Sequence, residues 1–288
     1  MDKLLAWSLA QQSGDKEAMA KIGQPDMKAL NSLFGGVDEP TLMTQAMLVA
    51  QNPEASVEDR EVALENFEML IENLDNANNI ENLKLWPAVI SLLDESVDSS
   101  LRVLAASIVG IAVQNNTKSQ EDFLKYDTGF KSLVQYSVDP STSVELKLKL
   151  LFAISSLVRN NQDSFKFFNK LKGWTILTLL DKHDNHKVDI RVLSVLSSVL
   201  TSESLFKSEI EAKLHEYKLV DKLINSLLND NITCMEKSLS ILGQLISLNF
   251  KFEAGELKLL SKNIDKISHL KEEYSEDFAK IRKITKSA

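Results

Sequence analysis

Carboxamide side chains recur along the chain at a spacing that would bring them together on one surface. Asn73, Asn115 and Asn160 are 42 and 45 residues apart, and each ends a long apolar pattern of helical periodicity. An amide offers donors and an acceptor, so a row of amides can bind the backbone or polar surface of a partner protein. Asparagine also tolerates the left-handed conformation found where helices end. The sequence leaves both roles open.

Other residues would add to such a surface. Arg159 and Arg191 would supply forked cationic donors that suit a carboxylate on a partner. Five asparagines lie between Asn73 and Asn82, close to the small Ala77. A polar turn between repeats explains two or three of these asparagines. The others predict a surface that a partner approaches closely.

Residues that support catalysis or metal binding are sparse. His183 and His186 have i, i+3 spacing, but their segment reads as a polar loop and suggests no third ligand. Cys234 is predicted to be a buried structural thiol, and Glu68 and Glu72 are predicted to form a solvated helix face. No phosphate-binding loop, nucleophile elbow or zinc-protease motif occurs. The sequence predicts a protein that is not an enzyme and that uses neither a metal nor another cofactor.

Composition narrows the class of protein further. The 288 residues include 9 glycines and 5 prolines, too few for an all-β protein, which predicts a mostly helical chain. The net charge of −8 disfavours nucleic-acid binding. A single cysteine fits a reducing compartment, no apolar run approaches membrane-spanning length, and the N-terminus has no signal-cleavage pattern. We expect a cytoplasmic protein that binds no membrane, and we expect a monomer.

Internal repeats give the elements that would position these residues. Two further anchors, Ser202 and Leu248, follow Asn160 at intervals of 42 and 46 residues, within the range of armadillo and HEAT repeats. Apolar residues stand three, six and nine positions before every anchor, which gives each long helix a buried face. These columns are Leu70, Ala112, Leu157, Val199 and Leu245; Phe67, Val109, Ile154, Leu196 and Leu242; and Leu64, Ala106, Leu151, Leu193 and Leu239.

Short helices before the long ones favour armadillo over HEAT. Gly129 and Gly173 are 44 residues apart, and each is predicted to form the tight bend before a short helix. Pro87 can open the corresponding helix of the preceding repeat. The predicted fold is all-α, a right-handed superhelical armadillo solenoid with helical caps. Its predicted parts are a flexible N-terminal segment (1–40), the armadillo repeats (41–252) and a C-terminal helical cap (253–288).

The run from Glu68 to Trp86 resembles the signature of the cytosolic armadillo-type nucleotide exchange factors of the heat-shock 70 kDa chaperones. Residues 3–8, 14–20 and 23–26 resemble the yeast members, as do 112–116 and 157–160. The resemblance extends to about residue 200 and weakens beyond it. It implies a protein-folding cofactor, with an associated role in translation regulation.

The resemblance also implies a mechanism without covalent chemistry. The concave face would embrace one lobe of the chaperone's nucleotide-binding domain and displace it, so that ADP leaves and ATP enters. A mobile N-terminal segment would help to release polypeptide from the chaperone, and Leu4, Leu5, Trp7 and Leu9 would carry that role. The alternative for this segment is a helix docked on the first repeat. The residues expected to bind the partner are Asn73, Ala77, Asn78, Asn79, Asn115, Asn116, Arg159, Asn160 and Arg191.

Two other classes of protein remain as alternatives. An armadillo adaptor that binds an extended basic peptide would carry tryptophans at regular positions on its third helices. Trp7, Trp86 and Trp174 all lie outside the predicted third helices, which disfavours the adaptor. A hydrolase or metal enzyme would have to use His183 and His186, and a chelator would test for it.

Overall fold

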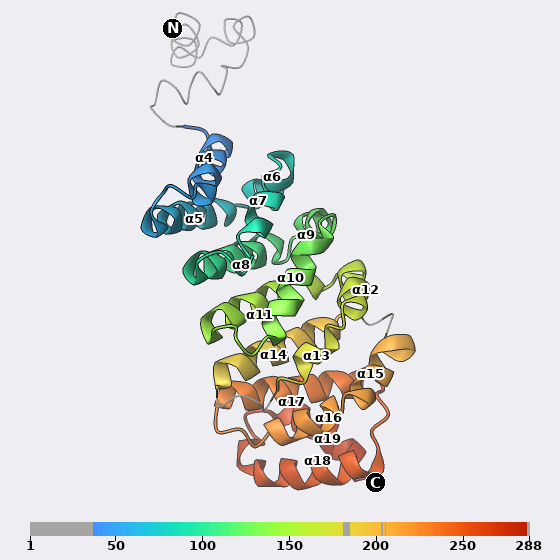
Figure 1. The fold of residues 1–288 in the computed structure, drawn as a ribbon. Helices are drawn as coiled ribbons and strands as arrows, with labels where there is room; N and C mark the ends of the chain where they lie inside the picture. The colour runs from blue at the N-terminus through green and yellow to red at the C-terminus, as the bar shows by residue number, and fades with distance from the viewer. Residues whose placement is uncertain (1–36, 181–184, 203, 205, 287–288) are drawn as a thin grey trace, which may run out of the picture.

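The computed structural model describes residues 37–180, 185–202, 204 and 206–286, and these ranges form a succession of helices (Figure 1). The helices are α4 (Glu39–Gln51), α5 (Val57–Ile71), α6 (Leu74–Asn82), α7 (Trp86–Ser91), α8 (Ser99–Val113), α9 (Thr117–Leu124), α10 (Asp127–Val138), α11 (Val144–Val158), α12 (Gln162–Lys170), α13 (Trp174–Leu177), α14 (His186–Val199), the π-helix η2 (Phe206–Ile210), α15 (Glu211–Glu216), α16 (Leu219–Ser226), α17 (Ile232–Ser247), α18 (Ala254–Lys266), the 3₁₀-helix η3 (Ser268–Leu270) and α19 (Ser275–Thr285).

The long helices α5, α8, α11, α14 and α17, which we call the third helices, form the spine of the molecule. Each packs against the next along the chain, and Figure 1 shows them stacked in sequence order with the shorter helices beside them. Two shorter helices precede each of α8, α11 and α14, and η2, α15 and α16 precede α17, whereas α4 alone precedes α5 within the described residues. This is the armadillo arrangement predicted from the repeats.

Polar residues fix where the third helices begin and end. Ser56, Asp98, Ser143, Asn185 and Asn231 are the N-caps, and each side chain accepts a hydrogen bond from a backbone N–H of the first turn. Three of the third helices are followed, after their C-caps, by an asparagine in the left-handed conformation, with φ of 54° to 56°. These asparagines are Asn115, Asn160 and Asn249.

The core lies along the predicted apolar columns. Every column residue is buried except Leu70, which is half-buried. Leu70 belongs to the first third helix, α5, where the described structure has no preceding repeat to cover that position. The alignment on five anchors therefore identified the buried faces correctly.

The two glycines are needed for their missing Cβ, as expected, but neither forms a left-handed bend. Gly129 lies inside α10, where a Cβ would come within 2.7 Å of the Phe123 ring. Gly173 has a right-handed conformation, and a Cβ there would lie 2.3 Å from the Phe168 ring. The left-handed residue before α13 is its neighbour Lys172, with φ of 60°. Both glycines therefore allow close packing of aromatic rings. The prediction for Pro87 is confirmed, because it stands in the first turn of α7.

The C-terminal helices extend the packed array. Helix α18 packs against α16, and α19 packs against α17 and α18. The proposed division at residues 40 and 252 stays a prediction. The segment with Leu4, Leu5, Trp7 and Leu9 lies outside the described residues, as does His183. Among the described helices, none has both the length and the apolarity needed to cross a bilayer.

Candidate partner-binding face

Three adjoining hollows follow the third helices and form one surface, which we call the third-helix face. Their volumes are about 300, 350 and 450 Å³. The first and second share Gln114, and the second and third share Arg191 and Ser194. Besides these shared residues, the first is lined by Ile71, Glu72, Leu74, Ala77, Ile111, Ala112 and Asn116; the second by Asn115, Phe152, Ser155, Ser156 and Arg159; and the third by Glu145, Leu148, Lys149, Lys187, Ile190 and Lys237.

The second hollow brings together three of the predicted residues from three repeats. Asn115 comes from the end of α8, Arg159 from the end of α11, and Arg191 from the middle of α14. The Arg191 guanidinium lies 5.1 Å above the centre of the Phe152 ring, a cation–π contact. The Phe152 ring in turn lies over Gly110, where a Cβ would come within 2.4 Å of it. Close packing at Gly110 therefore positions Phe152, and Phe152 orients Arg191.

Three cations of this face, Arg159, Arg191 and Lys237, form no ion pair with a carboxylate of the described residues. Burial lowers the pKa of Lys237, and the charges of Arg159 and Arg191 lower it further. Burial also lowers the pKa of Arg191. Within the described residues, no carboxylate lies within 4 Å of the charged groups of these three side chains. A chain with a net charge of −8 thus gathers partly desolvated positive charge in one place, which favours binding of a carboxylate.

A polar ladder crosses α5, α8 and α11 beside the hollows. The Lys149 ammonium donates to Ser107 Oγ at 3.0 Å, and Ser107 Oγ donates to Glu68 Oε1 at 2.5 Å. Glu68 was expected on a solvated helix face, but it is half-buried and hydrogen-bonded to the next repeat. That expectation was wrong for Glu68, and Glu72 is exposed as predicted.

The three anchor asparagines do not have equivalent roles. Asn115 and Asn160 take the left-handed conformation after α8 and α11, so the helix-cap role is confirmed for both. Asn115 also lines the second hollow, whereas Asn160 is exposed and lines none of the three. Asn73 differs, because it is the N-cap of α6 and accepts from the Asp75 N–H at 2.8 Å. Its structural counterpart is therefore Asn116, the N-cap of α9, one residue beyond the predicted register.

Ala77 and Asn116 form part of the floor of the first hollow. Ala77 is 4% exposed, and its carbonyl accepts from Ser119 Oγ at 3.2 Å. Asn116 is 6% exposed, and its amide nitrogen donates to Ser119 Oγ and to the Ala112 carbonyl. Contact of these two side chains with a partner stays a prediction, since their observed hydrogen bonds are internal.

Four of the five asparagines of this run lie in helix α6, and Asn73 alone stands before it, where a polar turn was expected to hold two or three of them. Asn76 is buried, and its amide nitrogen donates to Glu39 Oε2 at 2.8 Å and to the Leu70 carbonyl at 2.9 Å. Asn79 Oδ1 accepts from Asn82 at 3.0 Å. Asn78 and Asn79 are half-buried and line none of the three hollows. Internal hydrogen bonds thus account for several of these carboxamides.

A buried amide pair that the sequence reasoning missed supports the second hollow from below. Gln120 Nε2 donates to the Ser156 carbonyl at 2.8 Å and to the Arg159 carbonyl at 3.2 Å, and Gln120 Oε1 accepts from Asn161 Nδ2 at 3.0 Å. Both amides are buried. They tie α9 and α12 to the end of α11, and so hold the backbone that carries Arg159.

Three lysines of the face, Lys149, Lys187 and Lys237, were also missed, although the repeat register contained a signal for Lys149 and Lys237. Lys149, Arg191 and Lys237 all stand eleven residues before their anchors, so a cation recurs in three successive repeats. The sequence reasoning followed the apolar columns and singled out only Arg191. The same alignment, read for the opposite helix face, would have found the other two.

The remaining chemical candidates line none of the three hollows. His186 is exposed at the start of α14, and Cys234 is buried with its Sγ 3.6 Å from the His186 carbonyl. Burial of Cys234 confirms the prediction of a structural thiol position. The described residues contain no cluster of three histidine, cysteine or carboxylate side chains placed to hold a metal ion.

Comparison with known families and proteins covers nearly the whole chain. Residues 1–80 match the family described as Nucleotide exchange factor Fes1, and residues 76–239 match the SIL1/FES1/HPBP1 C-terminal domain. The Hsp70 nucleotide exchange factor FES1 of Debaryomyces hansenii is 51% identical over 278 residues, covering 96% of each chain. That of Saccharomyces cerevisiae is 43% identical over 282 residues, covering 96% of this chain and 97% of its own.

Solved structures agree on the fold. A designed armadillo repeat protein aligns over 85% of this chain and 97% of its own, with a TM-score of 0.66 and 12% identity. Another designed armadillo protein, solved in complex with the peptide (KR)4, aligns over 86% of this chain and 99% of its own, with a TM-score of 0.67 and 13% identity. These similarities support the armadillo fold alone.

Proposed function

The chain belongs to the SIL1/FES1/HPBP1 family, and we propose that it is a nucleotide exchange factor for cytoplasmic Hsp70 chaperones with no catalytic activity of its own. The observation that carries this proposal is the identity of 43–51% to Hsp70 nucleotide exchange factors over almost the full chain. The third-helix face is the surface with which it would bind the chaperone.

The chemistry of that face indicates what the chaperone must present. Arg159, Arg191 and Lys237 are partly desolvated and lack carboxylate partners among the described residues. A carboxylate on the chaperone's nucleotide-binding domain would neutralise them, and Asn115 could orient the same group. Ala77 and Asn116 would meet the chaperone at the floor of the first hollow. Asn73, Asn78, Asn79 and Asn160 would contact it only outside the hollows.

Exchange would follow from thermodynamic linkage. If the chain binds the nucleotide-free chaperone more tightly than the ADP-bound form, it must weaken ADP binding by the same factor. A 100-fold weakening requires about 2.7 kcal/mol of differential binding energy. Charge-assisted hydrogen bonds contribute roughly 1.5–3 kcal/mol each, so one or two contacts made only with the open chaperone are sufficient.

Stopped-flow release of a fluorescent ADP from a purified cytoplasmic Hsp70 tests the proposal. The release rate should rise and saturate with increasing concentration of the chain. The variant Ala77→Arg should abolish the effect, since its long cationic side chain would occupy the first hollow. Ala254→Arg, an exposed alanine on α18, is the matched control and should behave as the wild type. Unchanged ADP release with the wild-type chain would contradict the proposal.

Release of polypeptide from the chaperone is assigned to the N-terminal segment with Leu4, Leu5, Trp7 and Leu9. Replacing these four residues with serine should slow release of a labelled peptide from Hsp70 and leave ADP release unchanged. Equal peptide release by the variant and the wild type would remove the segment from the mechanism.

The alternative function is an adaptor that binds an extended basic peptide. One of the similar designed proteins was solved with such a peptide, (KR)4. In this chain, Lys149, Arg191 and Lys237 recur along the corresponding helices and would repel it. Fluorescence polarisation with a labelled (KR)4 peptide tests the adaptor role, and tight binding would favour it.

A further inference from the structure

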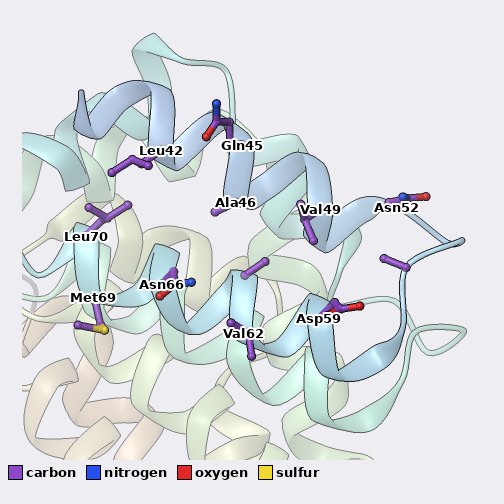
Figure 2. Close-up of a pocket in the computed structure, with 12 residues that line it drawn as sticks. Leu42, Gln45, Ala46, Val49, Asn52, Asp59, Val62, Asn66, Met69 and Leu70 are labelled. Atoms are coloured by element: carbon purple, nitrogen blue, oxygen red, sulfur yellow. The ribbon is translucent and has the colours of Figure 1, made fainter. Parts of the chain in front are cut away.

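An apolar groove lies at the N-terminal end of the described structure and shares no lining residue with the three hollows. It has a volume of about 890 Å³ and runs between α4 and α5, which lie side by side (Figure 2). We call it the α4/α5 groove. It is lined by Leu42, Gln45, Ala46, Val49, Asn52, Ala55, Asp59, Val62, Ala63, Asn66, Met69 and Leu70.

Large apolar side chains along this groove are open to solvent. Met69 is 71% exposed, Val62 55% and Val49 41%, and Figure 2 shows them along the two helices. Single exposed apolar residues are common, whereas several around one hollow indicate an interaction site.

The repeat architecture explains why the groove is open. Asn66 stands seven residues before its anchor, and its counterparts Ile108, Ala153, Val195 and Ile241 are all buried. In those repeats a preceding third helix packs alongside, as α5 does on α8 and α8 on α11. In the described residues, α5 has no such predecessor. The groove is therefore the position that a preceding helix would cover, and an end repeat needs a cap.

The chain supplies a segment with the right pattern immediately before α4. Met27, Leu30, Leu33 and Phe34 have helical spacing that places them on one face. Pro25 suits the first turn of a helix, and Gly35 suits the position just after its end. The family match to residues 1–80 spans this segment and both helices of the groove together.

The dimensions also agree. Four residues, 35–38, separate the segment from α4, and short connections join antiparallel helices. A ten-residue helix over 25–34 is about 15 Å long, which equals the rise along α4 between Leu42 and Asn52. Folded back along α4, such a helix would place Leu33 near Met69, at the Leu42 end of the groove.

We propose that residues 25–34 form a helix that occupies the α4/α5 groove and caps the first repeat. The groove is then a permanent intrachain interface and not a binding site for another molecule. The more distal segment with Leu4, Leu5, Trp7 and Leu9 stays available for other contacts. This inference is independent of the exchange function.

Disulfide trapping in the full chain tests the placement directly. Leu33→Cys combined with Met69→Cys should form an intrachain disulfide on mild oxidation, since a bond requires Cα atoms within about 7 Å. Met27→Cys with Met69→Cys is the matched control and should form no disulfide. Six residues of helix place Met27 about 9 Å further along the groove than Leu33. The native Cys234 is buried and distant in the stack.

Three results would overturn the proposal. A crosslink only between two chains would show that a second copy occupies the groove. A crosslink of Leu5→Cys to Met69→Cys in place of the Leu33 pair would assign the groove to the distal segment. Absence of any crosslink, with the variants folded by circular dichroism, would show an open groove.

A double-mutant cycle provides a second readout that does not require oxidation. Leu33→Asp and Met69→Asp should each lower the melting temperature by about 3–6 °C, and the double variant should lose little more than either alone. Leu48→Asp is the matched control, since Leu48 is 66% exposed on α4 outside the groove, and it should leave the melting temperature unchanged. A null effect of Met69→Asp would overturn the proposal.

Discussion

The third-helix face and the α4/α5 groove are two hollowed surfaces of one solenoid, yet their chemistry is opposite. The face carries half-buried cations without carboxylate partners among the described residues. The groove is lined mainly by aliphatic side chains and by methionine. The groove lies between α4 and α5, whereas the cations of the face stand on α11, α14 and α17, so the two surfaces belong to different repeats of the stack.

This difference indicates how long each surface stays covered. Cations that have no carboxylate partner are hydrated when the face is free. A partner that binds them can therefore dissociate without exposing apolar surface. An apolar groove is stable only when it is covered. The face therefore suits a partner that binds and leaves during each chaperone cycle, whereas the groove suits a segment of the same chain.

The strongest test of the polar side of this comparison is charge reversal. Arg191→Glu combined with Lys237→Glu should reduce the acceleration of ADP release by about 100-fold or more. The reason is that the loss of buried charge pairs at an interface costs roughly 2–5 kcal/mol of binding free energy. Lys131→Glu, an exposed cation on α10, is the control and should retain full activity. Stopped-flow kinetics and a melting curve together separate lost binding from lost folding. Full exchange activity in the double variant would contradict the role of the face.

Salt should separate the two surfaces. Raising the ionic strength from about 0.05 to 0.5 M shortens the Debye length several-fold, so the ADP-release rate at subsaturating concentration should fall about tenfold. The coupling between Leu33→Asp and Met69→Asp should persist, because apolar burial is not screened. The ADP-release rate and the coupling between the two substitutions should be measured over the same series of salt concentrations. An exchange rate that is insensitive to salt would contradict an electrostatic face.

Lys237 is expected to lower the stability of the fold and to strengthen binding of the chaperone. Because burial and the neighbouring Arg159 and Arg191 lower its pKa, protonated Lys237 destabilises the fold at neutral pH. That penalty disappears as the pH rises through the lowered pKa towards the ordinary value. Lys237→Met should therefore raise the melting temperature by about 1–3 °C at neutral pH, should raise it less at alkaline pH, and should slow ADP release.

The control for this prediction is Lys262→Met, an exposed lysine on α18. Its melting temperature should match that of the wild type at every pH. A lower melting temperature for Lys237→Met would show that its charge stabilises the fold.

The smallest expected effect separates the two roles of asparagine. Asn115 and Asn160 both have positive φ, so glycine at either position should change stability by less than about 0.5 kcal/mol, whereas alanine should cost about 1 kcal/mol. Asn115→Gly also removes a carboxamide from the second hollow and should slow ADP release about threefold. Asn160→Gly should leave ADP release unchanged. Equal effects of the two glycine variants would show that the hollow does not define the contact.

Much of the fold could be predicted because equivalent positions of successive repeats are buried. Phe67, Val109 and Ile154 are buried as expected, since equivalent positions of stacked helices face the same core. Leu70 departs because, among the described residues, no repeat precedes α5 and covers it.

The site was predicted less completely, for two physical reasons. Asn73 and Asn115 have the same side chain in different backbone positions, an N-cap and a residue after a C-cap, and a shift of one residue separates these roles. Glu68 and Lys149 are joined through Ser107 across two repeats. Contacts of that kind depend on the packing between helices, which composition and spacing do not specify.

The most direct test of the account is the affinity of the chain for Hsp70 with and without ADP, measured by calorimetry or surface plasmon resonance. Linkage predicts that saturating ADP weakens binding of the chain by the same factor by which the chain weakens binding of ADP. Arg191→Glu combined with Lys237→Glu should reduce both factors together. Equal affinity for the ADP-bound and nucleotide-free chaperone would contradict the proposed exchange mechanism.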